Sequence, residues 1–227
     1  MSQLKVYGTP MSRAARTLWM CRELAIPFEL VNVQFADGST KTPEYLAINP
    51  NGRIPSIQDG DFTLYESMAI NLYLARKHPG PLTPATLEDE ARAWQWSFWV
   101  MTEVEKPLVT VLLQRLQMPA GSPEERYFRQ RVPRDAKKEA EALAELPKPF
   151  AVLEAELGKS KWLGGGSFTV TDLNVASVMF WTRLAHIDLT ATPRIAEWLD
   201  RCTSRPAFGA ELAGARFSEG KVNEAGR

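Results

Sequence analysis

The sequence predicts two structural units, a small α/β unit followed by an all-helical one. Short strand and helix patterns alternate over residues 1–78. A proline-rich stretch, PGPLTP, then opens a linker at residues 79–87. Beyond it strand patterns nearly vanish, and apolar residues recur at helical spacing within residues 88–227, up to a polar tail that begins at Arg216. No internal repeat interrupts this order of elements.

The first unit opens with a strand–helix–strand pattern. The apolar run Leu4–Tyr7 ends at a glycine and predicts a strand. Residues 13–25 carry apolar side chains on one face at helical spacing, and Pro27 ends that helix. Phe28–Val33 predicts the second strand. Because a helix connects them, we expect the two strands to pair in parallel.

The rest of the first unit is a loop, a hairpin and a helix. The loop is rich in Gly, Asp, Asn and Pro and leaves room for one short helix at Pro43–Ala47. Two strands follow around Asp59-Gly60, a dipeptide that tolerates the positive φ of a tight hairpin turn. Apolar residues at helical spacing then predict a helix from Ser67 to Lys77.

The second unit reads as a series of helices separated by prolines and glycines. The expected helices cover residues 88–118, 122–157 with breaks at Pro133, Pro147 and Pro149, 170–185, and 194–203. Two local signals stand out within them. Thr169 and Asp172 have the spacing of a helix capping box, with Phe168 and Leu173 placed to form a hydrophobic staple.

The second local signal is the aromatic stretch WQWSFWV at residues 94–100. Trp94 and Phe98 are four residues apart, and Trp96 and Trp99 are three apart, so the rings occupy two sides of one helix. Large apolar side chains on two sides predict burial between neighbouring elements.

Composition excludes several classes of protein. Lys plus Arg and Asp plus Glu both number 27, so there is no basic excess that would indicate nucleic-acid binding. Cys21 and Cys202 lie far apart, and His78 and His186 have no neighbours at ligand spacing, so we expect neither a disulfide framework nor a metal site. No apolar run reaches the ~20 residues that span a bilayer. We expect a cytoplasmic protein that does not interact with membranes.

Three stretches in the first unit combine into a specific pattern: TPMSRAAR, NPNGRIPSIQDGD and YESMAI. Taken singly, each is typical of a helix cap or a strand edge. In this order, and with the capping motif FTVTDLNVA and the later SRPAF, they resemble the cytosolic glutathione transferases of the serine type. The likeness is nearest to phi- and theta-like classes and covers almost the whole chain. It implies a thioredoxin-like first domain, an all-helical second domain and a homodimer.

The resemblance implies a role for each matching residue. Ser12 matches the serine whose hydroxyl hydrogen-bonds the sulfur of glutathione, which makes it the expected catalytic residue. Other matches imply contacts with the rest of the tripeptide: Lys41, Arg53, Ile54, Pro55, Glu66 and Ser67, with Thr40 as a weaker candidate. Ile54 is expected to pair through its backbone, before a cis proline. Thr40 and Arg53 depart from the histidine and glutamine that phi-type enzymes often carry.

The chemistry of these residues suits a small anionic thiol without reference to any family. Helix N-termini offer unpaired N–H groups and the positive end of a dipole, and Ser12 and Ser67 each stand at one. A thiol with a pKa near ~8.5 is only about 3% ionised at pH 7, and the thiolate is the nucleophile. A hydroxyl that donates to the sulfur therefore raises the reactive fraction. Glutathione would act as co-substrate, with no cofactor.

The expected reaction is addition of the glutathione thiol to apolar electrophiles, with reduction of organic hydroperoxides as a further activity. The electrophile pocket is expected between the two units, with Met11, Phe35 and Trp99 as candidate lining residues.

Two other readings remain open. The departures at Thr40 and Arg53 would also suit a protein that keeps the fold for ligand binding or interaction without catalysis. A cysteine-dependent thiol oxidoreductase would need a cysteine where Ser12 stands, and Cys21 lies too far inside the helix. A serine hydrolase is disfavoured because neither histidine sits in a triad-like motif.

Overall fold

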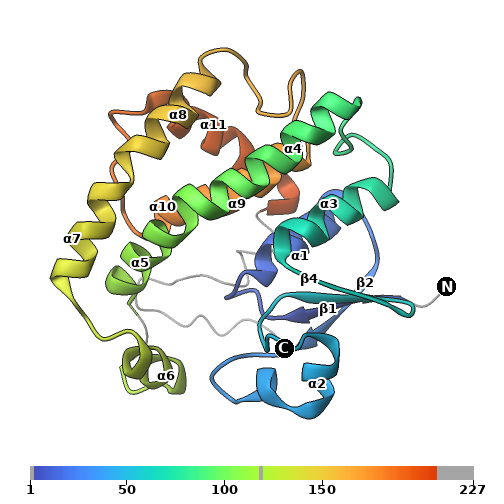
Figure 1. Cartoon of the computed structure of the whole chain (residues 1–227), viewed down its shortest axis with the longest axis vertical. Coiled ribbons are helices and arrows are strands. Elements are labelled where there is room, and N and C mark those ends of the chain that lie inside the picture. Colours follow the sequence, from blue (N-terminus) through green and yellow to red (C-terminus); the bar gives the residue numbers. More distant parts are fainter. Residues whose placement is uncertain (1–2, 118–119, 209–227) are drawn as a thin grey trace, which may run out of the picture.

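The computed structural model describes residues 3–117 and 120–208, so the expected polar tail from Arg216 lies outside the described residues. Figure 1 shows a small sheet with its helices on one side of the molecule and a group of longer helices on the other. No helix in the described ranges is long and apolar enough to cross a bilayer.

The sheet contains four strands in the order β2-β1-β3-β4. The strands are β1 (Leu4–Gly8), β2 (Phe28–Asn32), β3 (Ser56–Asp59) and β4 (Phe62–Tyr65). The predicted parallel pairing of β1 with β2 is confirmed, while β3 runs antiparallel to both β1 and β4.

The hairpin between β3 and β4 corrects one expectation. Asp59 pairs with Phe62, so the two turn residues are Gly60 and Asp61 rather than Asp59 and Gly60. Gly60 has a φ of 65°, which a glycine adopts at no steric cost. The Asp59 side chain instead accepts hydrogen bonds from Tyr73 and Lys77 on the following helix.

Three α-helices and one 3₁₀ turn complete the first unit: α1 (Ala14–Glu23), η1 (Ser39–Lys41), α2 (Pro43–Ile48) and α3 (Ser67–Lys77). α1 and α3 pack against each other on one face of the sheet, and α2 lies at the opposite face (Figure 1). This arrangement covers both faces of a mixed sheet, which is the expected thioredoxin-like layout.

The named elements of the second unit, within its described part, are all helical. Its elements are α4 (Leu87–Trp99), the π-helical segment η2 (Val100–Val104), α5 (Glu105–Arg115), α6 (Pro123–Arg131), α7 (Ala136–Glu145), α8 (Pro147–Leu157), α9 (Val170–Met179), α10 (Trp181–Leu184) and α11 (Pro193–Thr203). The expected break at Pro149 is wrong. Pro149 lies in the first turn of α8, where a missing N–H costs no intrahelical hydrogen bond.

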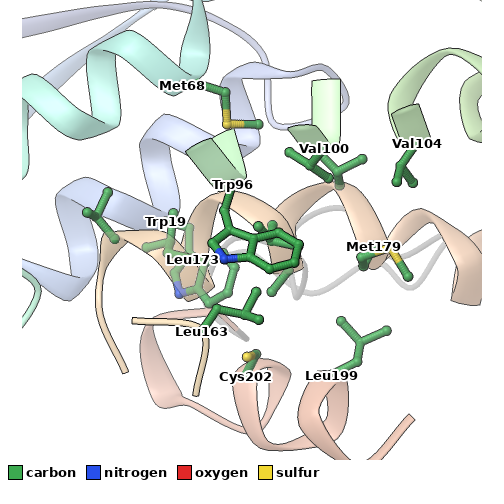
Figure 2. Close-up of a cluster of buried hydrophobic side chains, with 14 of the residues drawn as sticks. Trp19, Met68, Trp96, Val100, Val104, Leu163, Leu173, Met179, Leu199 and Cys202 are labelled. Atoms are coloured by element: carbon green, nitrogen blue, oxygen red, sulfur yellow. The ribbon is translucent and has the colours of Figure 1, made fainter. Parts of the chain in front are cut away.

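Helix α9 forms the centre of the molecule, because every one of its residues is buried. Helices from both units pack against it, including α1, α3, α4 and α11. Figure 2 shows Trp19 and Met68 of the first unit in one cluster with Trp96, Leu173 and Leu199 of the second. The two units therefore share a single continuous core.

The start of α9 confirms the predicted capping box between Thr169 and Asp172. Asp172 also does more than cap the helix. Its carboxylate accepts hydrogen bonds from the backbone N–H groups of Leu163 and Gly164 and from the indole of Trp198 at 2.9 Å. One buried side chain thus joins the preceding loop, α9 and α11.

The aromatic stretch at 94–100 is only partly buried. Trp96 is 5% exposed and packs toward α9, as expected, with Trp99 edge-on against it. The other side contradicts the expectation, since Trp94 is 46% and Phe98 72% exposed. Helical spacing placed the rings on two sides, but only the side that carries Trp96 is buried.

Candidate functional site

The N-termini of α1 and α3 meet at one edge of the sheet and carry two of the predicted site residues. Ser12 lies just before α1, and Ser67 is the first residue of α3. Arg16 in α1 donates to the Ser67 hydroxyl at 3.3 Å, so the two helix ends are directly linked. Both ends direct N–H groups and positive dipole ends toward the same region, which suits an anionic ligand.

The Ser12 hydroxyl already has two hydrogen bonds. Its Oγ donates to the carbonyl of Thr9 at 2.8 Å and accepts from the N–H of Ala14 at 3.1 Å. The side chain is partly exposed. A ligand that accepts a hydrogen bond from the Ser12 hydroxyl must therefore replace the carbonyl of Thr9. The hydrogen bond from the Ala14 N–H can persist.

The loop before β3 contains the cis peptide bond expected between Ile54 and Pro55. Two side chains that the sequence analysis did not identify form hydrogen bonds with the backbone of this loop. The Tyr45 hydroxyl and the Asn49 amide both donate to the carbonyl of Arg53, at 2.6 and 2.7 Å. Both also lie within hydrogen-bond distance of Ser56 Oγ. These buried contacts fix the backbone at Ile54.

Glu66 adopts a backbone conformation that is rare for a residue with a side chain. Its φ is 72° and its ψ 111°, and its side chain makes no capping contact with α3. Such conformations cost about 1–3 kcal/mol and concentrate at ligand sites. The residue is exposed, directly before the buried Ser67.

The basic residues of the predicted site lie at its outer side. Lys41 and Arg53 are both exposed. The Lys41 ammonium lies 3.5 Å from the carbonyl of Asn51 and directly beside Gly52, where an added Cβ would approach it to 2.5 Å. Gly52 also has a φ of 56°, so this position requires glycine. Thr40, in contrast, is buried and contributes its side chain to the interior.

The three residues predicted to line an electrophile pocket occupy different environments. Met11 is 58% exposed beside Ser12. Phe35 stacks on Tyr127 of α6, with ring centroids 6.4 Å apart. Trp99 packs edge-on against Trp96. Tyr127 was not found from the sequence, because nothing local indicates that α6 returns to the first unit.

Cysteine chemistry finds no support in this structure. Cys21 and Cys202 are free and buried. Burial raises the pKa of the Cys21 thiol to about 12, and it raises the pKa of Cys202 as well. Within the described ranges, no group of three His, Cys, Asp or Glu side chains could hold a metal ion.

The family of the chain follows from its matches to known proteins. Residues 2–76 match the family model for the N-terminal domain of glutathione S-transferase, and residues 108–206 match that for its C-terminal domain. Glutathione S-transferase 3 of Zea mays is 34% identical over 226 residues, which cover 94% of this chain and 95% of that protein. The chain belongs to the glutathione S-transferase family.

Solved structures support the same fold. The structure of glutathione S-transferase-I with bound lactoylglutathione has a TM-score of 0.79 at 32% identity and covers 93% of this chain and 99% of its own. A theta-class enzyme from Xanthomonas axonopodis pv. citri, with glutathione bound, has a TM-score of 0.81 at 27% identity and covers 93% and 98%. The thioredoxin-like fold with a helical second unit, and the likeness to phi- and theta-type enzymes, are confirmed.

Proposed function

We propose that this member of the family is an active glutathione transferase in which Ser12 stabilises the thiolate of bound glutathione. The observation that carries the proposal is the convergence of two helix N-termini and a cis-proline loop at one edge of the sheet. This arrangement offers backbone groups and positive dipole ends to an extended anionic peptide.

Each part of the tripeptide has a candidate partner. The backbone of Ile54 would pair with the cysteinyl residue in the manner of an added strand. Ser67 and the α3 N-terminus would hold the γ-glutamyl carboxylate, and the exposed Glu66 would accept from its ammonium group. Arg53, next to Ile54, would contact the cysteinyl part, and the exposed Lys41 would attract the glycine carboxylate. These roles rest on position and charge.

The reaction would begin when the thiol loses its proton to solvent, leaving a thiolate that accepts a hydrogen bond from Ser12. The sulfur then attacks an electrophilic carbon, and the leaving group departs with the bonding electron pair. With an organic hydroperoxide, the sulfur would attack oxygen instead. Two glutathione molecules would then yield the disulfide, an alcohol and water. No cofactor enters either reaction, and a cytoplasmic location stays a prediction.

The test is conjugation of glutathione to a chloro-nitroaromatic electrophile, together with calorimetric binding of glutathione. Saturable conjugation and measurable binding heat are the expected results. A protein that binds apolar ligands but shows no heat with glutathione would instead be a non-catalytic binding protein.

We also propose that the protein is a homodimer that uses the exposed aromatic side of α4. Phe62 on β4 contacts Tyr73 on α3 with ring centroids 5.1 Å apart. Tyr73 and Trp94 line one hollow of about 250 Å³ together with the oppositely charged Arg76 and Glu90. Phe98 extends this apolar surface along α4. An apolar patch of this kind, with side chains of both charges beside it, suits a second copy of the chain.

A further inference from the structure

One buried carboxylate of the helical unit contacts both the N-cap residue of α1 and a residue within α1. It belongs neither to the capping motifs nor to the proposed contacts with the tripeptide. Glu105, the first residue of α5, is 7% exposed. Its Oε1 accepts from Arg13 Nε at 2.5 Å and from Arg16 Nη2 at 3.5 Å. These two arginines lie on the first unit, so Glu105 joins the units beside the candidate site.

Arg16 needs this partner because it is almost fully buried. The residue is 2% exposed, and burial lowers the pKa of its guanidinium to about 10, while the Glu105 charge acts in the opposite direction. The guanidinium also lies 4.7 Å from the ring of Trp181 and 3.5 Å from Met101 Sδ. A buried cation without a carboxylate would be strongly destabilised, so Glu105 determines where the guanidinium rests.

The position of Glu105 depends on the π-helical segment η2 that precedes it. The N–H of Glu105 bonds to the carbonyl of Val100, five residues back. Pro107 supplies the reason, since it has no N–H for the carbonyl four residues before it and its ring crowds that turn. The altered turn presents Met101 and Glu105 to the same guanidinium.

Arg16 transmits this placement to the candidate site. Its Nη1 donates to Ser67 Oγ at 3.3 Å, at the N-terminus of α3. Arg13, the second arginine on Glu105, directly follows Ser12. A single carboxylate therefore sets the spacing between the residue proposed to face the thiol and the residue proposed to face the γ-glutamyl group.

We propose that Glu105 is a positioning residue for glutathione, which acts through Arg16 on the Ser67 end of the site and sets affinity for the γ-glutamyl group. The inference rests on the proposed function. It assigns to a residue of the helical unit a part in binding a ligand that lies on the α/β unit. Glu105 would affect how tightly the γ-glutamyl end of glutathione binds. Stabilisation of the thiolate would depend on Ser12.

The test compares two thiols with one chloro-nitroaromatic electrophile: glutathione, and cysteinylglycine, which lacks the γ-glutamyl group. In Glu105→Gln we expect the KM for glutathione to rise about tenfold, equivalent to about 1.4 kcal/mol. The KM for cysteinylglycine should stay within about twofold of its wild-type value. The pH at which the rate rises should not change, because ionisation of the thiol is unaffected. Glu103→Gln, an exposed neighbour in η2, is the matched control and should behave as wild type.

A second comparison tests the route through Ser67. In a Ser67→Ala background, Glu105→Gln should raise the KM for glutathione by less than about twofold, because the transmitting contact is gone. Should Glu105→Gln not fold, Glu105→Asp retains the charge, shortens the side chain and allows the same comparison. Thermal unfolding identifies folded variants before kinetics are measured.

The outcomes separate this inference from the proposed function. Wild-type protein without glutathione binding heat would overturn both. Normal wild-type binding, with an unchanged KM for glutathione in folded Glu105→Gln, would overturn the inference alone. Equal losses with both thiols, or an undiminished effect in the Ser67→Ala background, would also overturn it, because they would indicate general damage.

Discussion

Replacing Ser12 by alanine tests the proposed mechanism most directly, and the structure sets the size of the effect. A hydrogen bond to a charged acceptor contributes about 1.5–3 kcal/mol. The hydroxyl must first give up its 2.8 Å bond to the carbonyl of Thr9, a neutral bond with a net value of about 0.5–1.5 kcal/mol. The difference is roughly 1.2 kcal/mol, which corresponds to a change of about 0.9 in the pKa of bound glutathione.

The assay is the pH dependence of kcat/KM for conjugation. Removing the hydroxyl disfavours the charged form, so the apparent pKa of the bound thiol should rise by about one unit in Ser12→Ala. At pH values well below that pKa the rate should fall about tenfold, because the thiolate fraction falls in proportion. Well above the pKa the thiol is ionised in both proteins and the difference should shrink.

Ser12→Thr keeps a hydroxyl and serves as the control, with an expected profile close to that of wild type. Both variants should be checked by thermal unfolding, because alanine also removes the acceptor for the Ala14 N–H. A superimposable pH profile in folded Ser12→Ala would refute the reasoning, since no contribution of the hydroxyl to the thiolate would remain.

Three further predictions concern the rest of the molecule. Iodoacetamide should not modify native Cys21 appreciably at pH 8, because a thiol with a pKa of about 12 is only about 0.01% ionised there; labelling at the rate of a free cysteine would contradict its burial. Phe98→Glu should convert the dimer to a monomer in light scattering, whereas Val152→Glu, an equally drastic change at an exposed site on α8, should not. Arg205→Ala should lower the free energy of unfolding in urea by about 2 kcal/mol, because it removes the cation that donates two hydrogen bonds to the buried Glu23 carboxylate. Glu23→Gln should lower the free energy of unfolding less in the Arg205→Ala background than in wild type, which would show that the two residues are coupled.

Local signals in the sequence determined much of the fold. Helical spacing predicted α3 from Ser67 to Lys77, and the structure gives the same bounds. The spacing of Thr169 and Asp172 predicted the capping box at the start of α9. These features depend on residues within one or two helical turns of each other, so their partners can be recognised from neighbouring positions in the sequence.

The same local reasoning failed where a neighbour far along the chain decides the outcome. It identified the aromatic sides of α4 but not which of them α9 covers, so Trp94 and Phe98 were expected to be buried. The family resemblance implied the cis peptide at Ile54, which the structure contains, but nothing in the sequence indicated that Tyr45 and Asn49 hydrogen-bond to the carbonyl of Arg53 beside it.

The candidate site shows the same division. The sequence by itself determined which residue types stand at the two helix starts, because capping and charge are local properties. Only the tertiary structure brought Arg16 to Ser67, 51 residues away, and Glu105 to Arg16, 89 residues away. A buried guanidinium must find its partners wherever the packed chain provides them, and no spacing along the sequence encodes that choice.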